Sequence, residues 1–421
     1  MGRTIAEKIL SANVGRPVEP GEIIRAEYDV AACHDAFTAP TIDRLEDWGG
    51  GELADPSKLV LVPDHYVPSH SEHAKHLYNR MKEFAEERGV EHFYPLKDTG
   101  LLHNVLPEDG LVKPGDVVVG TDSHMVTAGA IGAFSTGIGI TDLAFGWTEG
   151  WVWLRVPETL RIDYHGTTGD WVRGKDIVLH TLGELGADGA VYQSVEFGGP
   201  LVRELPMDDR FTIANMSVEL GAMTGLFEPD DRMLEYVEDR VDADEEYRPY
   251  ASDDDAEYDQ HIEIDCSGLG PQVAAPSSPA NVGAVDDVLG IEVDQAVVGS
   301  CTNNRPEDLK LAAEILDGHT LDDDVRMIVT PGTRGIEKQA LAEGWLETFY
   351  EAGVHMANPG CGACFGEPIG ALDEHEVAVT TTNRNFVGRM GAESSEVYLA
   401  NPAVAAASAI TGEITHPRSV V

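Results

Sequence analysis

Five short apolar runs constrain the fold of this chain more than any other feature. Each is rich in β-branched residues and is followed by a polar loop or a helical stretch: Lys58–Val62, Asp116–Gly120, Gln295–Gly299, Arg326–Thr330 and Glu376–Thr380. Continuous runs of this kind are typical of strands buried on both faces of a parallel sheet. The sequence therefore predicts an α/β fold built on parallel sheets.

The charge balance excludes several classes of function. The chain has 421 residues, with 29 Lys and Arg against 74 Asp and Glu, and its formal net charge is −45. A field this negative repels phosphate backbones and anionic lipids, so we expect neither a nucleic-acid partner nor a membrane-surface role. No run of 18 apolar residues is present to span a bilayer. Acid spread over most of the chain is typical of proteins adapted to high intracellular salt, and an anionic substrate would need a local group of cations.

Composition shifts suggest where domains begin and end. The stretch 228–257 is dominated by Asp and Glu, which predicts a solvated surface excursion. The stretch 271–281 contains three prolines and is predicted to be an extended connector. We therefore predict a domain boundary at this connector, and a chain of this length is long enough for two or three domains.

Polar side chains follow four of the five predicted strands. They are Asp64 and His65 after the first, Asp122, Ser123 and His124 after the second, Cys301 after the third, and Asn383 and Arg384 after the fifth. In open α/β sheets, ligands bind beyond the carboxyl ends of the strands. Carboxylates, imidazoles, a thiol and a guanidinium are therefore expected to lie at positions that can converge.

The cysteines indicate a metal or redox site and not a disulfide framework. Five cysteines with irregular spacing fit a reducing cytoplasm. Cys361 and Cys364 form a C-x-x-C motif, which zinc, dithiol and iron–sulfur sites all use. With Cys301 they make three thiolates in a glycine-rich setting, which suits a cluster with an open fourth position, whereas structural zinc needs a fourth ligand such as His355. Cys33 and Cys266 are predicted to be buried small hydrophobes.

Four motifs together resemble the aconitase superfamily. They are Gly299-Ser300-Cys301-Thr302-Asn303, the C-x-x-C at 361–364, Asn383-Arg384-Asn385-Phe386-Val387-Gly388-Arg389, and Gly120-Thr121-Asp122-Ser123-His124. The resemblance covers nearly the whole chain and is strongest to the large subunits of the two-subunit members, 3-isopropylmalate dehydratase and homoaconitase, because the chain stops near Pro417. It implies a three-domain α/β/α architecture around a 4Fe-4S cluster, without the swivelling fourth domain. We place the three α/β domains at 1–157, 158–281 and 282–421.

The resemblance also implies roles for particular residues. Cys301, Cys361 and Cys364 would hold three irons and leave one labile iron open to the substrate. His65, backed by Asp64, would donate a proton to the leaving hydroxide, since an adjacent carboxylate keeps an imidazole charged. The further catalytic acids and imidazoles implied are His103, Asp122, His124 and Glu196. The implied substrate-binding residues are Arg384, Arg389, Ser123, Asn383 and His34.

The activity implied by this resemblance is that of a hydro-lyase. It would interconvert 2-isopropylmalate and 3-isopropylmalate by dehydration and rehydration in leucine biosynthesis. Homocitrate, citrate and dimethylmalate are the alternative substrates, and an RNA-binding relative is opposed by the net charge. A separate small subunit would carry the swivelling domain and the catalytic base, so we expect this chain alone to bind the cluster and turn over little.

A glycine-rich stretch, 129–139, resembles a dinucleotide-binding loop only superficially. It lacks the third glycine of the dinucleotide fingerprint. Close helix packing is the use that we predict for these glycines.

Overall fold

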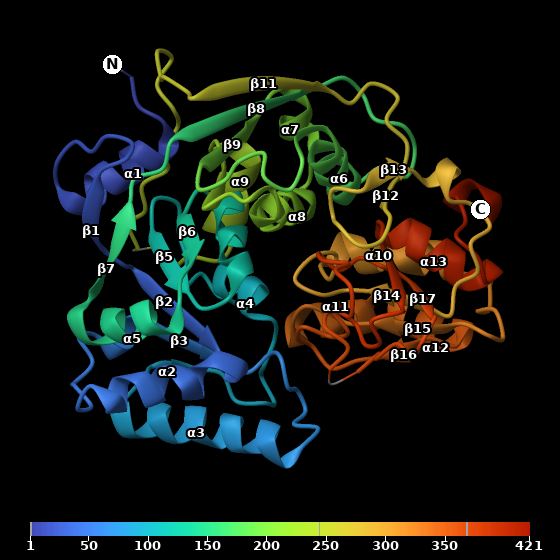
Figure 1. Cartoon of the computed structure of the whole chain (residues 1–421), viewed down its shortest axis with the longest axis horizontal. Coiled ribbons are helices and arrows are strands. Elements are labelled where there is room, and N and C mark those ends of the chain that lie inside the picture. Colours follow the sequence, from blue (N-terminus) through green and yellow to red (C-terminus); the bar gives the residue numbers. More distant parts are fainter. Residues whose placement is uncertain (1, 244, 368) are drawn as a thin grey trace. The chain divides into compact units, whose positions relative to one another are not determined.

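The computed structural model describes residues 2–243, 245–367 and 369–421. Contacts divide the chain into two compact units, one formed by 1–165 with 190–264 and the other by 166–189 with 265–421 (Figure 1). The described residues of the two units form four sheets. Within the described ranges, every helix is too short or too polar to cross a lipid bilayer.

A five-stranded parallel sheet forms the centre of the first unit. Its strands follow in the order β4 (His92–Phe93), β3 (Leu59–Val62), β2 (Val30–His34), β5 (Val117–Gly120) and β6 (Phe134–Gly137). The central strands β2, β3 and β5 are buried along their whole length, as their aliphatic sequences predict. The strands predicted at 58–62 and 116–120 are thus confirmed, and their carboxyl ends lie at the same edge of the sheet.

The long helix α3 (Glu72–Arg88) of the first unit is capped at both ends. It begins at Ser71, whose hydroxyl accepts the Ala74 N–H at 3.1 Å, and it ends at Gly89 in the left-handed region. It packs against α2 (Asp35–Asp47), and the two helices lie side by side in Figure 1. The remaining helices of the unit are α1 (Ile5–Val14), α4 (Leu102–Glu108), α5 (Ile140–Glu149), α7 (Pro200–Glu204), α8 (Met207–Met216) and α9 (Asp231–Glu238), with 3-10 turns η1 (Pro56–Lys58), η2 (Ser123–Ile131) and η3 (Ser217–Leu220).

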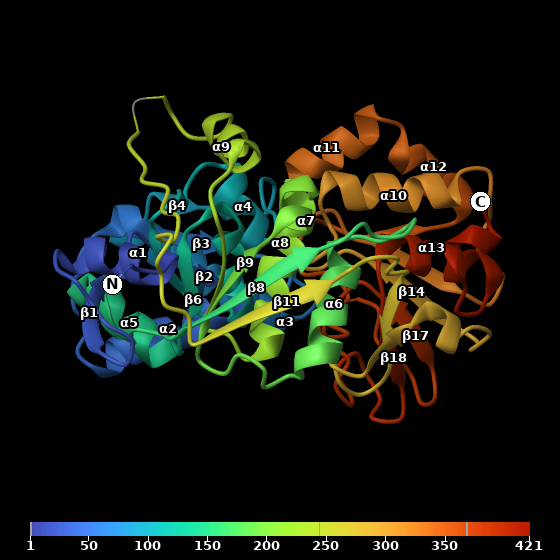
Figure 2. The same ribbon diagram turned by 90° about the horizontal axis from the view of Figure 1, so that it is seen from above.

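Two smaller sheets complete the first unit. One has the order β10 (Thr224–Phe227), β9 (Ser194–Gly198), β8 (Thr159–His165) and β11 (Gln260–Asp265), and Figure 2 shows β8 and β11 side by side. The other is an antiparallel ribbon of β1 (Ile23–Glu27) and β7 (Trp151–Arg155). The acidic stretch that follows β10 is mostly exposed where it is described, as predicted.

A seven-stranded sheet forms the centre of the second unit. Its order is β13 (Val282–Ala284), β12 (Gln272–Ala274), β18 (Glu396–Leu399), β17 (Val377–Thr380), β14 (Gln295–Val298), β15 (Arg326–Val329) and β16 (His355–Met356), and the last five are parallel. The three strands predicted in this part of the chain are therefore confirmed. The helices are α6 (Gly174–Leu185), α10 (Pro306–Leu316), α11 (Arg334–Ala342), α12 (Trp345–Ala352) and α13 (Pro402–Thr411), with 3-10 turns η4 (Val285–Asp287) and η5 (Pro417–Ser419).

The predicted domain boundaries differ from the division of the chain into two compact units. The α6 segment belongs to the second unit, although it precedes the predicted boundary by a hundred residues of sequence. The proline-rich stretch contains β12, which pairs with β13 and β18, so it is a short strand followed by a turn. The division into three domains stays a prediction.

The glycine-rich stretch at 129–139 serves close packing, as predicted. A Cβ on Gly129 would lie 1.8 Å from the carbonyl oxygen of Gly225, so η2 and β10 approach each other through bare backbone. By contrast, a Cβ on Gly139 would lie 3.4 Å from the Asp142 carboxylate, which is ordinary contact distance.

Gly129→Ala should therefore destabilise the protein by about 3 kcal/mol, since a backbone segment must move to admit the methyl group. Gly139→Ala should change stability by less than about 1 kcal/mol. Denaturant unfolding of the two variants checks this. Equal stability of the two variants would show that the close approach at Gly129 is relieved at little cost.

Candidate active site

Three loops meet at the carboxyl edge of the first unit's parallel sheet. His34 ends β2, and Asp64 and His65 follow β3. Asp122 and His124 follow β5. His34 lies opposite Val62 in the parallel register, so the residues after β3 are placed next to it by strand pairing alone.

Asp64 orients His65 and also holds a neighbouring helix. Its Oδ1 lies 2.6 Å from His65 Nδ1, and its Oδ2 accepts the Leu102 N–H at 2.9 Å. Leu102 begins α4, which carries His103. One buried carboxylate therefore sets the ring orientation of His65 and the position of His103.

Asp122 is the hub of the group. Its carboxylate lies 3.2 Å from His103 Nε2, 3.5 Å from His124 Nδ1, and 3.8 Å from the Nε2 atoms of both His34 and His65. It also accepts the His124 N–H at 2.7 Å, capping η2. The structure thus brings together six of the predicted residues: His34, Asp64, His65, His103, Asp122 and His124.

Charge within this group is distributed unequally between two stacked rings. The His34 and His65 rings are 3.9 Å apart and nearly parallel. Burial lowers the pKa of His34 to about 3, assisted by the neighbouring charge of His65. Burial also opposes the charge of His65, yet the carboxylates of Asp64 and Asp122 outweigh it and raise the pKa of His65 to about 10. At neutral pH the pair is one imidazolium and one neutral imidazole, and the imidazolium can donate a proton.

Two carboxylates that sequence analysis left out complete the group. Asp35 accepts the N–H groups of His65 at 3.0 Å and Tyr66 at 2.9 Å, and so fixes the loop after β3. Glu219 Oε1 lies 2.9 Å from His124 Nε2. The position of Asp35 directly after His34 is the sequence signal that could have indicated it, whereas Glu219 lies in η3 and follows no predicted strand.

The structure differs from the prediction at Glu196. This side chain lies on β9, fully buried, and accepts the Ile5 N–H at 2.7 Å and the Ser252 hydroxyl at 2.7 Å. Among the described residues its remaining partners are Tyr258 and Arg161, and none is an imidazole. Glu196 therefore anchors the start of α1, whereas Glu219 occupies the position beside His124.

In the second unit, two strand ends bring a cysteine and an asparagine into contact. Cys301 follows β14 and Asn383 follows β17, and these strands are paired in parallel. Cys301 Sγ lies 3.2 Å from Asn383 Oδ1, which also accepts the Ser300 hydroxyl at 3.1 Å. Arg384 is half-buried on the same loop.

Arg389 contacts one of the three predicted cluster ligands and interacts electrostatically with the other two. Cys301, Cys361 and Cys364 are each buried. Arg389 donates to Cys364 Sγ at 3.2 Å and to the Cys364 carbonyl at 3.1 Å. Burial lowers the pKa of Arg389, but the three thiols together raise it above its ordinary value.

The donor set fits an iron–sulfur cluster. Three buried thiols lie on two loops of one unit, and the charge of each acts on Arg389. Gly362, in the left-handed region, lets the C-x-x-C loop approach Thr330, where a Cβ would lie 2.4 Å from the threonine hydroxyl. The Arg389 guanidinium contacts Cys364, whereas its predicted role was to bind a substrate carboxylate. That role stays a prediction.

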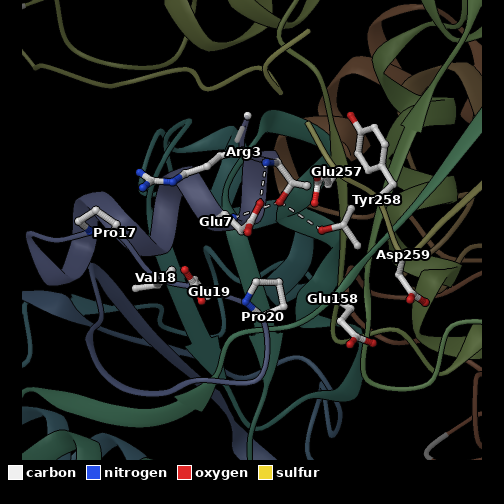
Figure 3. A pocket seen from close by; sticks show the side chains of 13 residues that line it. Arg3, Glu7, Pro17, Val18, Glu19, Pro20, Glu158, Glu257, Tyr258 and Asp259 are labelled. Carbon is white, nitrogen blue, oxygen red and sulfur yellow. Dashed lines mark hydrogen bonds between the residues drawn. The ribbon is translucent and has the colours of Figure 1, made fainter. Parts of the chain in front are cut away.

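Two cavities of the first unit differ in their relation to the imidazole group. The larger, about 680 Å³, is lined by carboxylates including Glu7, Glu19 and Glu158 (Figure 3). These carboxylates oppose an anionic substrate, and no predicted site residue lies among the described lining residues. The other, about 560 Å³, is lined by Thr121 and Ser123, which flank Asp122 in the chain.

Comparison with known proteins identifies the family of this chain. The model of the aconitase family (aconitate hydratase) matches residues 7–412. The chain belongs to the aconitase family. The 3-isopropylmalate dehydratase large subunit 1 of Methanopyrus kandleri is 51% identical over 99% of both chains. The 3-isopropylmalate dehydratase large subunits of Moorella thermoacetica and Halothermothrix orenii are 48% and 46% identical, each over the full length of both chains.

Family membership confirms the predicted α/β fold class and the predicted family. A member of this family is a hydro-lyase that carries an iron–sulfur cluster, so the enzyme class predicted from the motifs is confirmed as well. The individual roles of the site residues are not decided by membership alone.

Replacing Asp64 should move the alkaline limit of activity. Asp64→Asn removes a carboxylate that raises the pKa of His65, so this pKa falls toward its ordinary value. In the predicted role of His65 as proton donor the protonated ring is the active form, so a lower pKa should cause kcat/KM to be lost at lower pH than in the parent enzyme, whose alkaline limb is expected near pH 10. The measurement is the pH profile of kcat/KM, with the exposed Asp98→Asn as control. An unmoved alkaline limb in Asp64→Asn would exclude His65 as the titrating donor.

A Glu→Gln substitution at each position distinguishes the role of Glu219 from that of Glu196. Glu219→Gln removes the charge beside His124 and should lower kcat by about 10²-fold with little change in the melting temperature. Glu196→Gln keeps the shape of the anchor and should leave kcat within about threefold of the parent value, because its contacts are with α1. Steady-state kinetics and thermal melts of both variants decide the matter. Loss of kcat at Glu196 alone would restore its predicted catalytic role.

Proposed function

We propose that this chain is the large subunit of a 3-isopropylmalate dehydratase. It would interconvert 2-isopropylmalate and 3-isopropylmalate by loss and return of water, in leucine biosynthesis. The observation that carries the proposal is the match to large subunits of that enzyme at up to 51% identity over 99% of both chains. Two groups of residues also support the proposal. The imidazoles and carboxylates can supply acid–base chemistry, and the three cysteines can bind a cluster; a cluster-dependent dehydration needs both.

The cysteines would hold the cofactor. Cys301, Cys361 and Cys364 would bind three irons of a 4Fe-4S cluster, with Arg389 donating to the sulfur of Cys364. When bound, the cluster supplies a Lewis acid that makes hydroxide a better leaving group. Thiolate ligands must stay reduced, so a cytoplasmic location is part of the same proposal.

The imidazolium of His65 would donate the proton that the departing hydroxide needs. Asp64 bonds its Nδ1 and fixes the ring, so that Nε2 carries the proton to be transferred. Asp122 lies 3.8 Å from Nε2 and stabilises the charged ring before transfer. His124, paired with Glu219, would be a second residue next to Asp122 that can accept or donate a proton.

Substrate carboxylates would be bound by Arg384, with Ser123, Asn383 and His34 contributing polar groups. A guanidinium binds a carboxylate with two parallel hydrogen bonds, which suits a dicarboxylate substrate in a chain this acidic. A small subunit, implied by the large-subunit name of the relatives, would supply the base that removes the carbon-bound proton.

The test is a dehydration assay on the anaerobically reconstituted chain in high salt, with and without its small subunit. The substrates are isopropylmalate, homocitrate and citrate, and the unsaturated product is followed by its absorbance. Turnover of isopropylmalate only with the small subunit is expected. Preference for homocitrate would move the chain to homoaconitase, and turnover by the isolated chain would contradict the need for a partner.

Serine substitution of single cysteines tests the cluster ligands separately. Cys361→Ser should lose the visible absorption of the cluster and at least about 10²-fold in activity. Cys266→Ser is the matched control, because Cys266 is a buried cysteine of the same unit outside the thiol group, and it should keep both. Iron and sulfide analysis measures the loading. Full loading of Cys361→Ser would contradict the ligand assignment.

A further inference from the structure

A lysine is buried at the start of α6 in the second unit. Lys175 is the second residue of this helix and is 0% exposed. Burial disfavours an ammonium group, and the positive end of a helix dipole disfavours it further. A cation is retained at such a position only where its hydrogen bonds and its surroundings compensate for both effects.

The ammonium group binds two different loops. Its Nζ donates to the carbonyl oxygens of Thr381 at 2.8 Å and Thr382 at 2.7 Å, and to the hydroxyl oxygen of Thr302 at 3.3 Å. Thr302 directly follows Cys301, and Thr382 directly precedes Asn383. Lys175 therefore joins the loop that carries a cluster ligand to the loop that carries the substrate arginine.

The same two loops contact each other around this ammonium. The Thr302 hydroxyl donates to the Thr381 carbonyl at 2.8 Å, and the Gly299 N–H donates to the Thr381 hydroxyl at 2.9 Å. The Thr381 carbonyl thus accepts from both Thr302 and Lys175. Removing the ammonium would weaken a shared network, and a network of buried hydrogen bonds loses more than one bond when a member is removed.

The next residue makes the base of this network rigid. Asp176 accepts the N–H groups of Arg173 at 2.7 Å and Gln272 at 2.8 Å, and the Asn401 amide at 2.9 Å. The first turn of α6 is therefore held by β12 and by the start of α13. Lys175 projects from a fixed platform, which is what a positioning residue requires.

We infer that Lys175 is a positioning residue for the thiol site: its buried ammonium fixes the 299–303 loop against the 381–385 loop and binds a positive charge to Thr302, the residue that follows Cys301. The part that concerns the cluster rests on the proposed function. The part that concerns the two loops rests on the contacts of this chain alone.

Hydrogen exchange on the large subunit without cluster tests the loop contacts. Lys175→Met preserves the side-chain volume, and it should raise the exchange rates of amides in 299–303 and 381–385 together by about tenfold, while β14 and β17 stay protected. Lys58→Met is the matched control, since Lys58 donates to the Tyr28 carbonyl at 2.9 Å in the other unit, and it should leave both loops unchanged. Unchanged protection in Lys175→Met would overturn the inference. Lys175→Gln, which keeps a hydrogen-bond donor without the charge, is the second variant. If neither Lys175 variant folds, the inference is also overturned, because the residue would then be required for folding as a whole.

The complete two-subunit enzyme tests the electrostatic part. In Lys175→Gln the reduction potential of the cluster should become more negative, because a positive charge that stabilises the reduced state has been removed. KM for isopropylmalate should rise by about tenfold with a smaller change in kcat, since the arginine loop loses its position before the substrate binds. An unchanged potential and KM would contradict this part. If the parent protein bound no cluster, the proposed function would fail, and the exchange result would still decide the role of Lys175 in the two loops.

Discussion

Parallel pairing of β2 with β3 and β5 is the constraint on which the imidazole group depends. Parallel strands end at the same edge of a sheet, so residues that follow them lie together even though they are 30 to 90 positions apart in the sequence. His34, Asp64 and Asp122 are neighbours for this reason. The pairing of β14 with β17 places Cys301 beside Asn383 by the same rule in the second unit.

Opposing electrostatic effects then decide which groups carry charge. The net charge of −45 works against binding a dicarboxylate, so the cations of the two sites have to be held in place by local contacts. His65 stays charged because Asp64 and Asp122 outweigh its burial, while His34, stacked on it, is held neutral. Lys175 and Arg389 show the same principle around the thiols, where carbonyl oxygens and sulfur atoms compensate buried positive charge.

The strands and the residues that follow them could be predicted from sequence, because β-branched runs have a strong preference for buried strands and the polar loops come directly after them. The partners Asp35 and Glu219 were missed for different reasons. Asp35 follows β2, a strand that was not among the predicted ones. Glu219 lies within the 3-10 turn η3 and not after a strand, and its distance to His124 is set by how η3 packs on η2. Glu196 was predicted from the family resemblance alone, whereas in the structure it lies on β9 and accepts the Ile5 N–H at the start of α1. Likewise, the reach of Lys175 to two loops more than a hundred residues away depends on tertiary packing.

The central claim is that neighbouring carboxylates keep His65 charged where an ordinary histidine is neutral. The most direct test is ¹⁵N NMR of histidine-labelled protein between pH 6 and 10, with the His65 signals assigned from a His65→Gln variant. We expect the ¹⁵N signals of an imidazolium for His65 up to about pH 9, and the signals of a neutral imidazole for His34 over the whole range. Titration of His65 near its ordinary pKa of 6.5 would contradict it.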